Sequence, residues 1–212
     1  MKKYRFIYQF KLNKSKTIFN KRSKSVQVGI TLRDKRNNKS YNNVISTMFK
    51  KKEVKMGISL TFNGLKEITE KKLVGYRVVC SDITGYGQEI PKASLLLEQR
   101  KGEIMHLVEP VHLIGAFKVT ELSDEDDGYW VCYEVNEFEM IPEGMVCFMV
   151  PTQKYAVLHF KGHASQIYHV YTHLHEWINE NGYKRLPEEW TLEIYSKWTE
   201  TEDIVYLCDP IL

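Results

Sequence analysis

The order strand, helix, strand, strand occurs twice after residue 57 of this 212-residue chain. One such unit leaves its sheet incomplete, so two units that pair about a pseudo-twofold axis bury a joint core. That pairing leaves a cleft between the two helices, a usual place for a small ligand. We therefore predict an α+β fold of duplicated βαββ units, with an antiparallel sheet, two main helices and a ligand cleft between them. The predicted elements are residues 67–80, 89–103, 112–119 and 128–135 in the first unit, a further strand at 144–150, and 153–162, 163–181, 191–198 and 203–212 in the second.

The two predicted helices are recognised by the spacing of their apolar residues. Along 163–181, apolar side chains recur every three or four residues, and Asn181-Gly182 is a natural stop. In 89–103, Pro91 lies near the start and an apolar patch follows it. The preceding residues 81–87 hold two glycines and are interpreted as a loop.

Charge divides the chain into two segments. Residues 1–57 hold 17 of the 30 Lys and Arg residues but only 2 of the 27 Asp and Glu residues. The remaining residues are therefore acidic overall, although the whole chain carries a net charge of +3. We predict a basic extension over 1–55 and a ligand-binding domain over 56–212.

The basic extension has two interpretations. It can be an arm that binds nucleic acid, because clustered Lys and Arg neutralise phosphates. A short alternating stretch at 26–30 is strand-like, and no helix-turn-helix pattern is found. Alternatively, the codons for Lys51 to Gly57 can spell a bacterial ribosome-binding site just before Met56. Translation then begins at Met56, and nucleic acid is a partner only if the 1–55 arm is real.

Cysteine and hydropathy patterns bear on location and on metals. The four cysteines are isolated and form no CxxC pair, so we expect reduced thiols and no zinc site. We find neither a run of about 18 apolar residues nor a secretory signal, and we expect a cytoplasmic protein without a membrane partner. His169 and His173 are spaced like metal ligands, but no third ligand is evident, so no metal is expected.

Glu193 is the leading candidate for a functional residue. It lies among aromatic residues in a predicted strand, where alternation places it on the same face as Thr191 and Tyr195. A buried carboxylate without a partner has a raised pKa or needs a cation. The alternative is an exposed glutamate, or one that pairs with Lys197 or Lys154.

Several aromatic residues are candidates for the walls of a pocket around Glu193. Tyr195 shares its strand face, and Trp130 belongs to the first unit. Tyr168, Tyr171 and Trp177 belong to the second predicted helix, where Tyr171 also fits the apolar core face. Each of them can equally be an ordinary core residue.

Residues 58–212 resemble the AraC-type effector-binding, or GyrI-like, small-molecule-binding domain family. The stretches that carry the resemblance are GYRVVCSD (75–82), IPKASLLLEQ (90–99), YAVLHFKG (155–162), HEWINENGY (175–183), LEIY (192–195) and VYLCDPI (205–211). The resemblance implies a duplicated βαββ fold and a cleft for hydrophobic, often cationic, compounds with a glutamate at its base. That glutamate matches Glu193. Leu192 stands where the family often has an aromatic residue, and no DNA-binding domain is apparent.

The resemblance leaves more than one function open. Family members include domains of transcription regulators, proteins that sequester drugs or inhibit gyrase, and assigned hydrolases. The leading expectation is a stand-alone protein, monomeric or homodimeric, that binds an amphipathic, cationic or aromatic small molecule without a cofactor. The alternatives are a hydrolase that uses Glu193 as general acid or base, with or without Tyr195, and a gyrase-inhibitor-like or DNA-associated regulatory protein.

Overall fold

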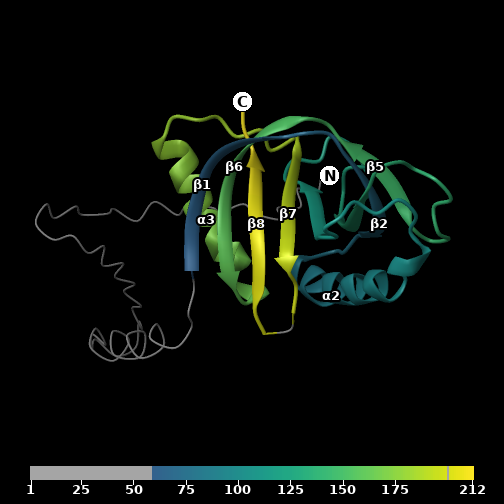
Figure 1. Cartoon of the computed structure of the whole chain (residues 1–212). Coiled ribbons are helices and arrows are strands. Elements are labelled where there is room, and N and C mark those ends of the chain that lie inside the picture. Colours follow the sequence, from purple (N-terminus) through teal and green to yellow (C-terminus); the bar gives the residue numbers. More distant parts are fainter. Residues whose placement is uncertain (1–58, 200) are drawn as a thin grey trace, which may run out of the picture. The chain divides into compact units, whose positions relative to one another are not determined.

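The structure is a computed structural model that describes residues 59–199 and 201–212. The basic extension, with its predicted strand at 26–30 and the proposed start at Met56, lies outside these residues. The described part holds two α-helices and an antiparallel sheet of eight strands (Figure 1). The elements are β1 (Ser59–Ile68), β2 (Lys71–Val78), α2 (Ile83–Gln99), β3 (Leu113–Lys118), β4 (Tyr129–Val135), β5 (Val146–Val150), β6 (Gln153–Gly162), α3 (Ile167–Glu180), β7 (Trp190–Lys197) and β8 (Asp203–Pro210), with short 3-10 turns at Lys101–Glu103 and Ala164–Gln166.

The strand order is β1-β6-β8-β7-β3-β4-β2-β5. Outward from the central β3–β7 pair, each half continues in the same way, with β4, β2 and β5 on one side and β8, β6 and β1 on the other. Every pairing is antiparallel. The predicted α+β class and antiparallel sheet are thus confirmed, whereas a duplication and a pseudo-twofold axis stay predictions.

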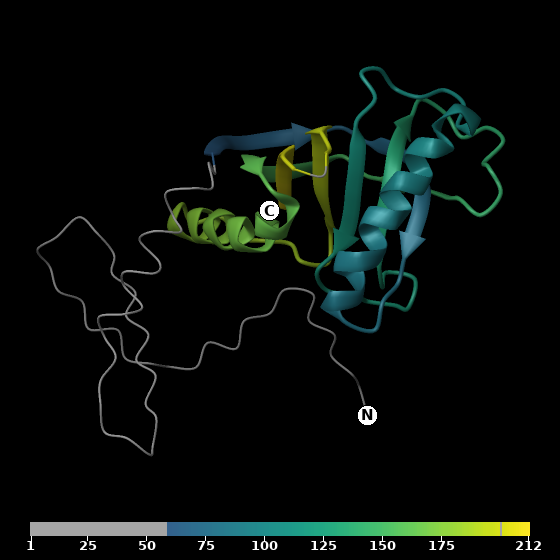
Figure 2. The same cartoon turned by 90° about the horizontal axis from the view of Figure 1, so that it is seen from below.

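Both helices pack on the same face of the sheet. Leu113 and Phe117 lie on one face of β3 because side chains alternate along a strand. Leu113 belongs to the apolar cluster that α2 covers, and Phe117 to the cluster that α3 covers. Figure 2 shows α3 beside one half of the sheet and α2 beside the other. A third cluster, made only of strand residues, fills the opposite face.

The predicted start of the first helix is wrong. Residues 83–87, interpreted as a loop, form the first turns of α2. The Asp82 carboxylate accepts a hydrogen bond from the Gly85 N–H at 2.9 Å and so caps the helix, which offsets the weak helix propensity of the glycines. Pro91 accordingly lies inside the helix instead of near its start.

Strand β1 was not predicted from the sequence. The predicted strand 67–80 combines the end of β1, a turn and β2. β1 is an edge strand whose side chains are largely exposed, so its residues lack the apolar alternation that marks a half-buried strand. Its pairing with β6, a distant segment, holds it in place.

Within the described residues, no helix is long and apolar enough to span a membrane.

The core of α2 provides a stability test with an internal control. Leu97 is fully buried, whereas Leu95, two residues earlier, is 53% exposed. We expect Leu97→Ala to lower the free energy of unfolding by about 2–5 kcal/mol, because it leaves a cavity. Leu95→Ala should change it by less than about 0.5 kcal/mol. Urea unfolding followed by circular dichroism measures both, and equal losses would contradict the packing of α2.

Candidate functional site

Glu193 lies at the middle of the sheet on the face that the helices cover. It sits on β7, where it pairs with Gly115 of β3 across the junction between the two halves. Only 3% of the residue is exposed. The alternative of an exposed strand glutamate is therefore wrong.

Three tyrosine hydroxyls donate hydrogen bonds to the Glu193 carboxylate. Tyr129 and Tyr195 donate to Oε2 at 2.6 Å and 2.9 Å, and Tyr171 donates to Oε1 at 3.2 Å. Tyr129 comes from β4, Tyr195 from β7 and Tyr171 from α3. The site therefore draws on both halves of the sheet and on one helix. We call these four residues the Glu193 cluster.

Gly115 makes room for this arrangement. A Cβ atom at position 115 would lie 1.8 Å from the Tyr129 hydroxyl oxygen. No side chain larger than hydrogen leaves that hydroxyl in place. The glycine in the otherwise apolar stretch LIGAFK thus opens the space through which Tyr129 reaches Glu193.

Burial raises the pKa of Glu193 above its ordinary value, and the nearby Asp203 carboxylate raises it further. The hydrogen bonds from the three tyrosines oppose this shift because they stabilise the carboxylate. The pKa values of Tyr129 and Tyr195 lie well above their usual range, because both hydroxyls are desolvated and face Glu193. The tyrosines are therefore donors to Glu193 and are not themselves ionised near neutral pH.

Aromatic rings surround the carboxylate. Phe117 stacks on Tyr129 with ring centroids 5.7 Å apart and meets Tyr171 edge-on at 6.2 Å. Tyr129 and Tyr195 are half-buried, and each packs against both the α2 cluster and the α3 cluster. The Glu193 cluster therefore lies at the seam between the two helices. A carboxylate with apolar walls can hold a proton or an organic cation.

The other predicted wall residues lie elsewhere. Trp177 stacks between Phe62 of edge strand β1 and Tyr183, with centroids 5.7 Å and 6.0 Å away. Tyr168 lies in the first turn of α3, with its ring against His169. Trp130 packs with strand residues on the opposite face of the sheet. The structure brings Tyr171 and Tyr195 to Glu193 and places these three apart from it.

Tyr129 is the site residue that the sequence analysis missed. Its neighbour Trp130 was chosen, but alternation along β4 sends adjacent side chains to opposite faces. The face of β4 that meets Glu193 can be assigned only when the registers of β4 with β3 and of β3 with β7 are known. The glycine at 115 was the available signal, since it marks a close approach within a strand.

Two hollows lie near the sheet, and Glu193 lines neither of them. One, of about 70 Å³, is bordered by the Lys71–Glu134 ion pair and by Ile114 and Ile194 on the face opposite the helices. The other is narrow and adjoins the Glu193 cluster through Tyr171. Neither of these hollows is the predicted cleft between the helices, which stays a prediction, and Glu193 itself is covered by other side chains.

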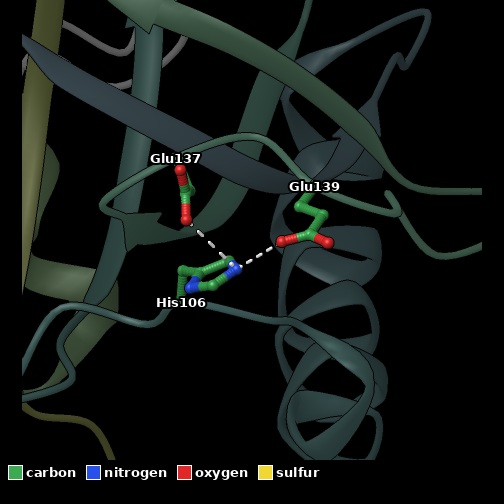
Figure 3. Close-up of side chains that lie close together, drawn as sticks. All are labelled: His106, Glu137 and Glu139. Atoms are coloured by element: carbon green, nitrogen blue, oxygen red, sulfur yellow. Dashed lines mark hydrogen bonds and ion pairs between the residues drawn. The ribbon is translucent and has the colours of Figure 1, made fainter.

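A separate group of ion-pairing side chains surrounds His106. Figure 3 shows Glu137 and Glu139 converging on its Nε2 atom, at 3.3 Å and 2.7 Å. Their possible ligand atoms lie within 4.8 Å of one another. The two glutamates are exposed, and a hydrogen bond between the imidazole and the Glu139 carboxylate accounts for the shorter contact.

Comparisons with known proteins agree with this architecture. Residues 65–211 match the model of a family described as the GyrI-like small molecule binding domain. No curated protein sequence matches the chain.

Three solved structures show a similar fold. EcmrR in a complex with DNA is 22% identical with a TM-score of 0.54; the match covers 79% of this chain and 62% of the EcmrR chain, less than two thirds of it. The EcmrR C-terminal domain alone is 21% identical with a TM-score of 0.55, over 74% and 99% of the two chains. SAV2435 bound to tetraphenylphosphonium is 13% identical with a TM-score of 0.56, over 72% and 94%. At such identities the likeness concerns the fold.

The raised pKa of Glu193 makes a pH-dependent contribution to stability. The folded state holds the Glu193 proton more tightly than the unfolded chain, whose glutamate pKa is about 4.3. The carboxyl therefore destabilises the fold progressively as pH rises from about 4.3 through the folded pKa. We expect the free energy of unfolding of wild type to fall relative to that of Glu193→Gln over this pH interval. Above the folded pKa, the difference between the two proteins should stay constant.

Urea unfolding between pH 4 and pH 8 measures this difference. Glu180→Gln, at an exposed position on α3, is the control and should track wild type throughout. A constant difference between wild type and Glu193→Gln across the range would contradict the raised pKa.

Proposed function

Because this chain belongs to the GyrI-like small molecule binding domain family, we propose that it binds an amphipathic organic cation over the Glu193 cluster. Small-molecule binding follows from the family. The cationic class of the ligand, the role of Glu193 and the opening of a cleft between α2 and α3 are our proposal.

The buried Glu193 carboxylate is the observation that carries this proposal. No Lys, Arg or His is among its hydrogen-bond partners in the described residues, and all three partners are neutral hydroxyls. Hydrogen bonds from hydroxyls offset part of the cost of burying a charge, but they do not neutralise it. A bound cation would supply the missing charge in surroundings where its attraction to the carboxylate is little screened.

The aromatic rings around Glu193 indicate which cations fit. Phe117, Tyr129 and Tyr171 present ring faces and edges near the carboxylate. Such walls favour a cation with apolar substituents, since cation–π attraction adds to the burial of apolar area. The SAV2435 structure, which shares the fold, holds tetraphenylphosphonium, a lipophilic cation. That ligand supports the class we propose.

A ligand must move side chains to reach Glu193. Tyr129 and Tyr195 are half-buried, while Glu193 and Tyr171 are almost fully buried. We propose that Tyr129 and Tyr195 swing outward at the seam between the helices and stack on the ligand. In the closed conformation their hydroxyls hold the carboxylate in place of the ligand.

The enzymatic alternative uses the same residues. A glutamate with a raised pKa in an apolar site is suited to act as a general acid or base near neutral pH. Turnover separates the two functions: product beyond one equivalent of protein, lost in Glu193→Gln, favours a hydrolase, whereas stoichiometric binding favours a sensor or sequestering protein.

Ligand charge provides the sharpest binding test. Tetraphenylphosphonium and tetraphenylborate have nearly the same shape and opposite charge. We expect wild type to bind the cation at least about tenfold more tightly, a difference of about 1.4 kcal/mol, because the Glu193 carboxylate attracts the cation and repels the anion in a poorly screened site. Glu193→Gln should lose most of this preference.

Isothermal titration calorimetry measures both affinities. Glu180→Gln, exposed on α3, is the charge-matched control and should keep the preference of wild type. Equal affinity of wild type and Glu193→Gln for tetraphenylphosphonium would reject the role of Glu193.

The proposed ion pair also sets a pH dependence. Affinity for tetraphenylphosphonium should increase as pH rises through the raised pKa of Glu193 and then level off, because only the carboxylate attracts the cation. Titrations from pH 5 to pH 8.5 check this. Glu193→Gln should show a flat profile, and a rising profile in that variant would place the titrating group elsewhere.

A further inference from the structure

Two buried polar atoms without a hydrogen-bond partner face the narrow hollow beside Tyr171. They are Oγ1 of Thr191 and Nε2 of His175. Both residues line that hollow, together with Phe117, Val119, Tyr171, Arg185 and Asp209. Only 1% of Thr191 is exposed, so bulk solvent does not reach its hydroxyl. Such an atom is costly to bury, and buried hydroxyls are nearly always paired.

The hollow is next to the Glu193 cluster. Thr191 lies two residues before Glu193 on the same face of β7, which places the two side chains about 7 Å apart along the strand. Tyr171 connects the two places: it lines the hollow and donates its hydroxyl hydrogen to Glu193. A ligand group bound at Glu193 would therefore lie about 7 Å from the Thr191 side chain.

The charges around the hollow favour a neutral group. Asp209 is fully buried and pairs with the Arg185 guanidinium through its Nε and Nη2 atoms. His175 Nε2 lies 3.2 Å from the same carboxylate, without hydrogen-bond geometry. Arg185 and Asp209 cancel each other, so a charged group entering the hollow finds no net opposite charge. A hydroxyl or carbonyl oxygen requires only the hydrogen-bond partners that are present.

His175 and Arg185 are partly exposed side chains that line the hollow. The side chains of His175 and Arg185 are 27% and 28% exposed, in contrast to Thr191 and Asp209. As it stands, the hollow is narrow, and a ligand group must displace one of these two side chains. Pairing the Thr191 hydroxyl would offset part of that cost.

We propose that the narrow hollow beside Tyr171, called the Thr191 hollow below, is a second subsite. It accepts a neutral hydrogen-bonding group of the ligand, roughly 7 Å from the ligand's cationic centre. This inference rests on the proposed function, because the cationic centre is the group held by Glu193. The preferred ligands are then amphipathic cations with a carbonyl or hydroxyl group at that distance. Purely hydrocarbon cations bind more weakly.

A matched pair of probes tests the subsite. 4-Acetylbenzyl-trimethylammonium and 4-isopropenylbenzyl-trimethylammonium differ only by an oxygen in place of a CH2 group at the far end of a rigid ring. Wild type should bind the acetyl probe about fivefold more tightly or better, the typical value of one hydrogen bond to an otherwise unpaired buried hydroxyl. Calorimetric titration gives the ratio directly.

Three variants locate the source of that preference. Thr191→Val keeps the shape and removes the hydroxyl, so the ratio should fall to about one while the isopropenyl probe binds as before. Thr191→Ser keeps the hydroxyl and should keep the preference, which guards against a general packing defect. Thr61→Val, at an exposed threonine on edge strand β1, should behave as wild type.

The outcomes separate this inference from the proposed function. If both probes bind equally to wild type and both weaken in Glu193→Gln, the subsite is rejected and the Glu193 site stands. If Thr191→Val retains the preference, the subsite is likewise rejected. If neither probe nor tetraphenylphosphonium binds wild type, the proposed function and the subsite fall together.

Discussion

The burial of one carboxylate at the centre of the sheet constrains most of what surrounds it. Glu193 sits on β7 at the junction with β3, where water is excluded and the carboxyl cannot be solvated. Three tyrosine hydroxyls take the place of water, and each comes from a different element. A side chain that needs partners from two strands and a helix fixes how closely those elements approach.

The opening that we propose lies at the junction between the two halves. Tyr129 and Tyr195 pack against the apolar clusters under both helices, so their movement need not disrupt either cluster's centre. The two apolar clusters lie on either side of this junction. One contains residues of α3, β6 and β8, and the other contains residues of α2, β2 and β4. The ligand site that we propose at this seam would require Tyr129 and Tyr195 to move, and both are only half-buried. The same seam leads through Tyr171 to the Thr191 hollow.

Part of the candidate site could be predicted from the sequence alone. Alternation in a short strand was enough to place Glu193 with Tyr195 and Thr191, and helical spacing put Tyr171 on the buried face of α3. The predicted walls also included Trp177, as an aromatic residue of the second predicted helix, and Trp130, as one from the first unit. Trp177 lies instead over edge strand β1, and Trp130 on the opposite face of the sheet. The presence of an aromatic residue makes it a candidate for lining a pocket, but it does not show which face of the sheet the side chain covers.

The sequence by itself determined the α+β class, most strand and helix positions, and the conflict posed by a carboxylate among aromatic residues. These depend on local periodicity, which is a property of each segment alone. Only the tertiary structure decided that Tyr129 completes the cluster, that Gly115 makes room for it and that β1 extends the sheet. Each of these depends on register between strands distant in the sequence. A one-residue slip in that register sends every side chain to the other face, so no local pattern can specify it.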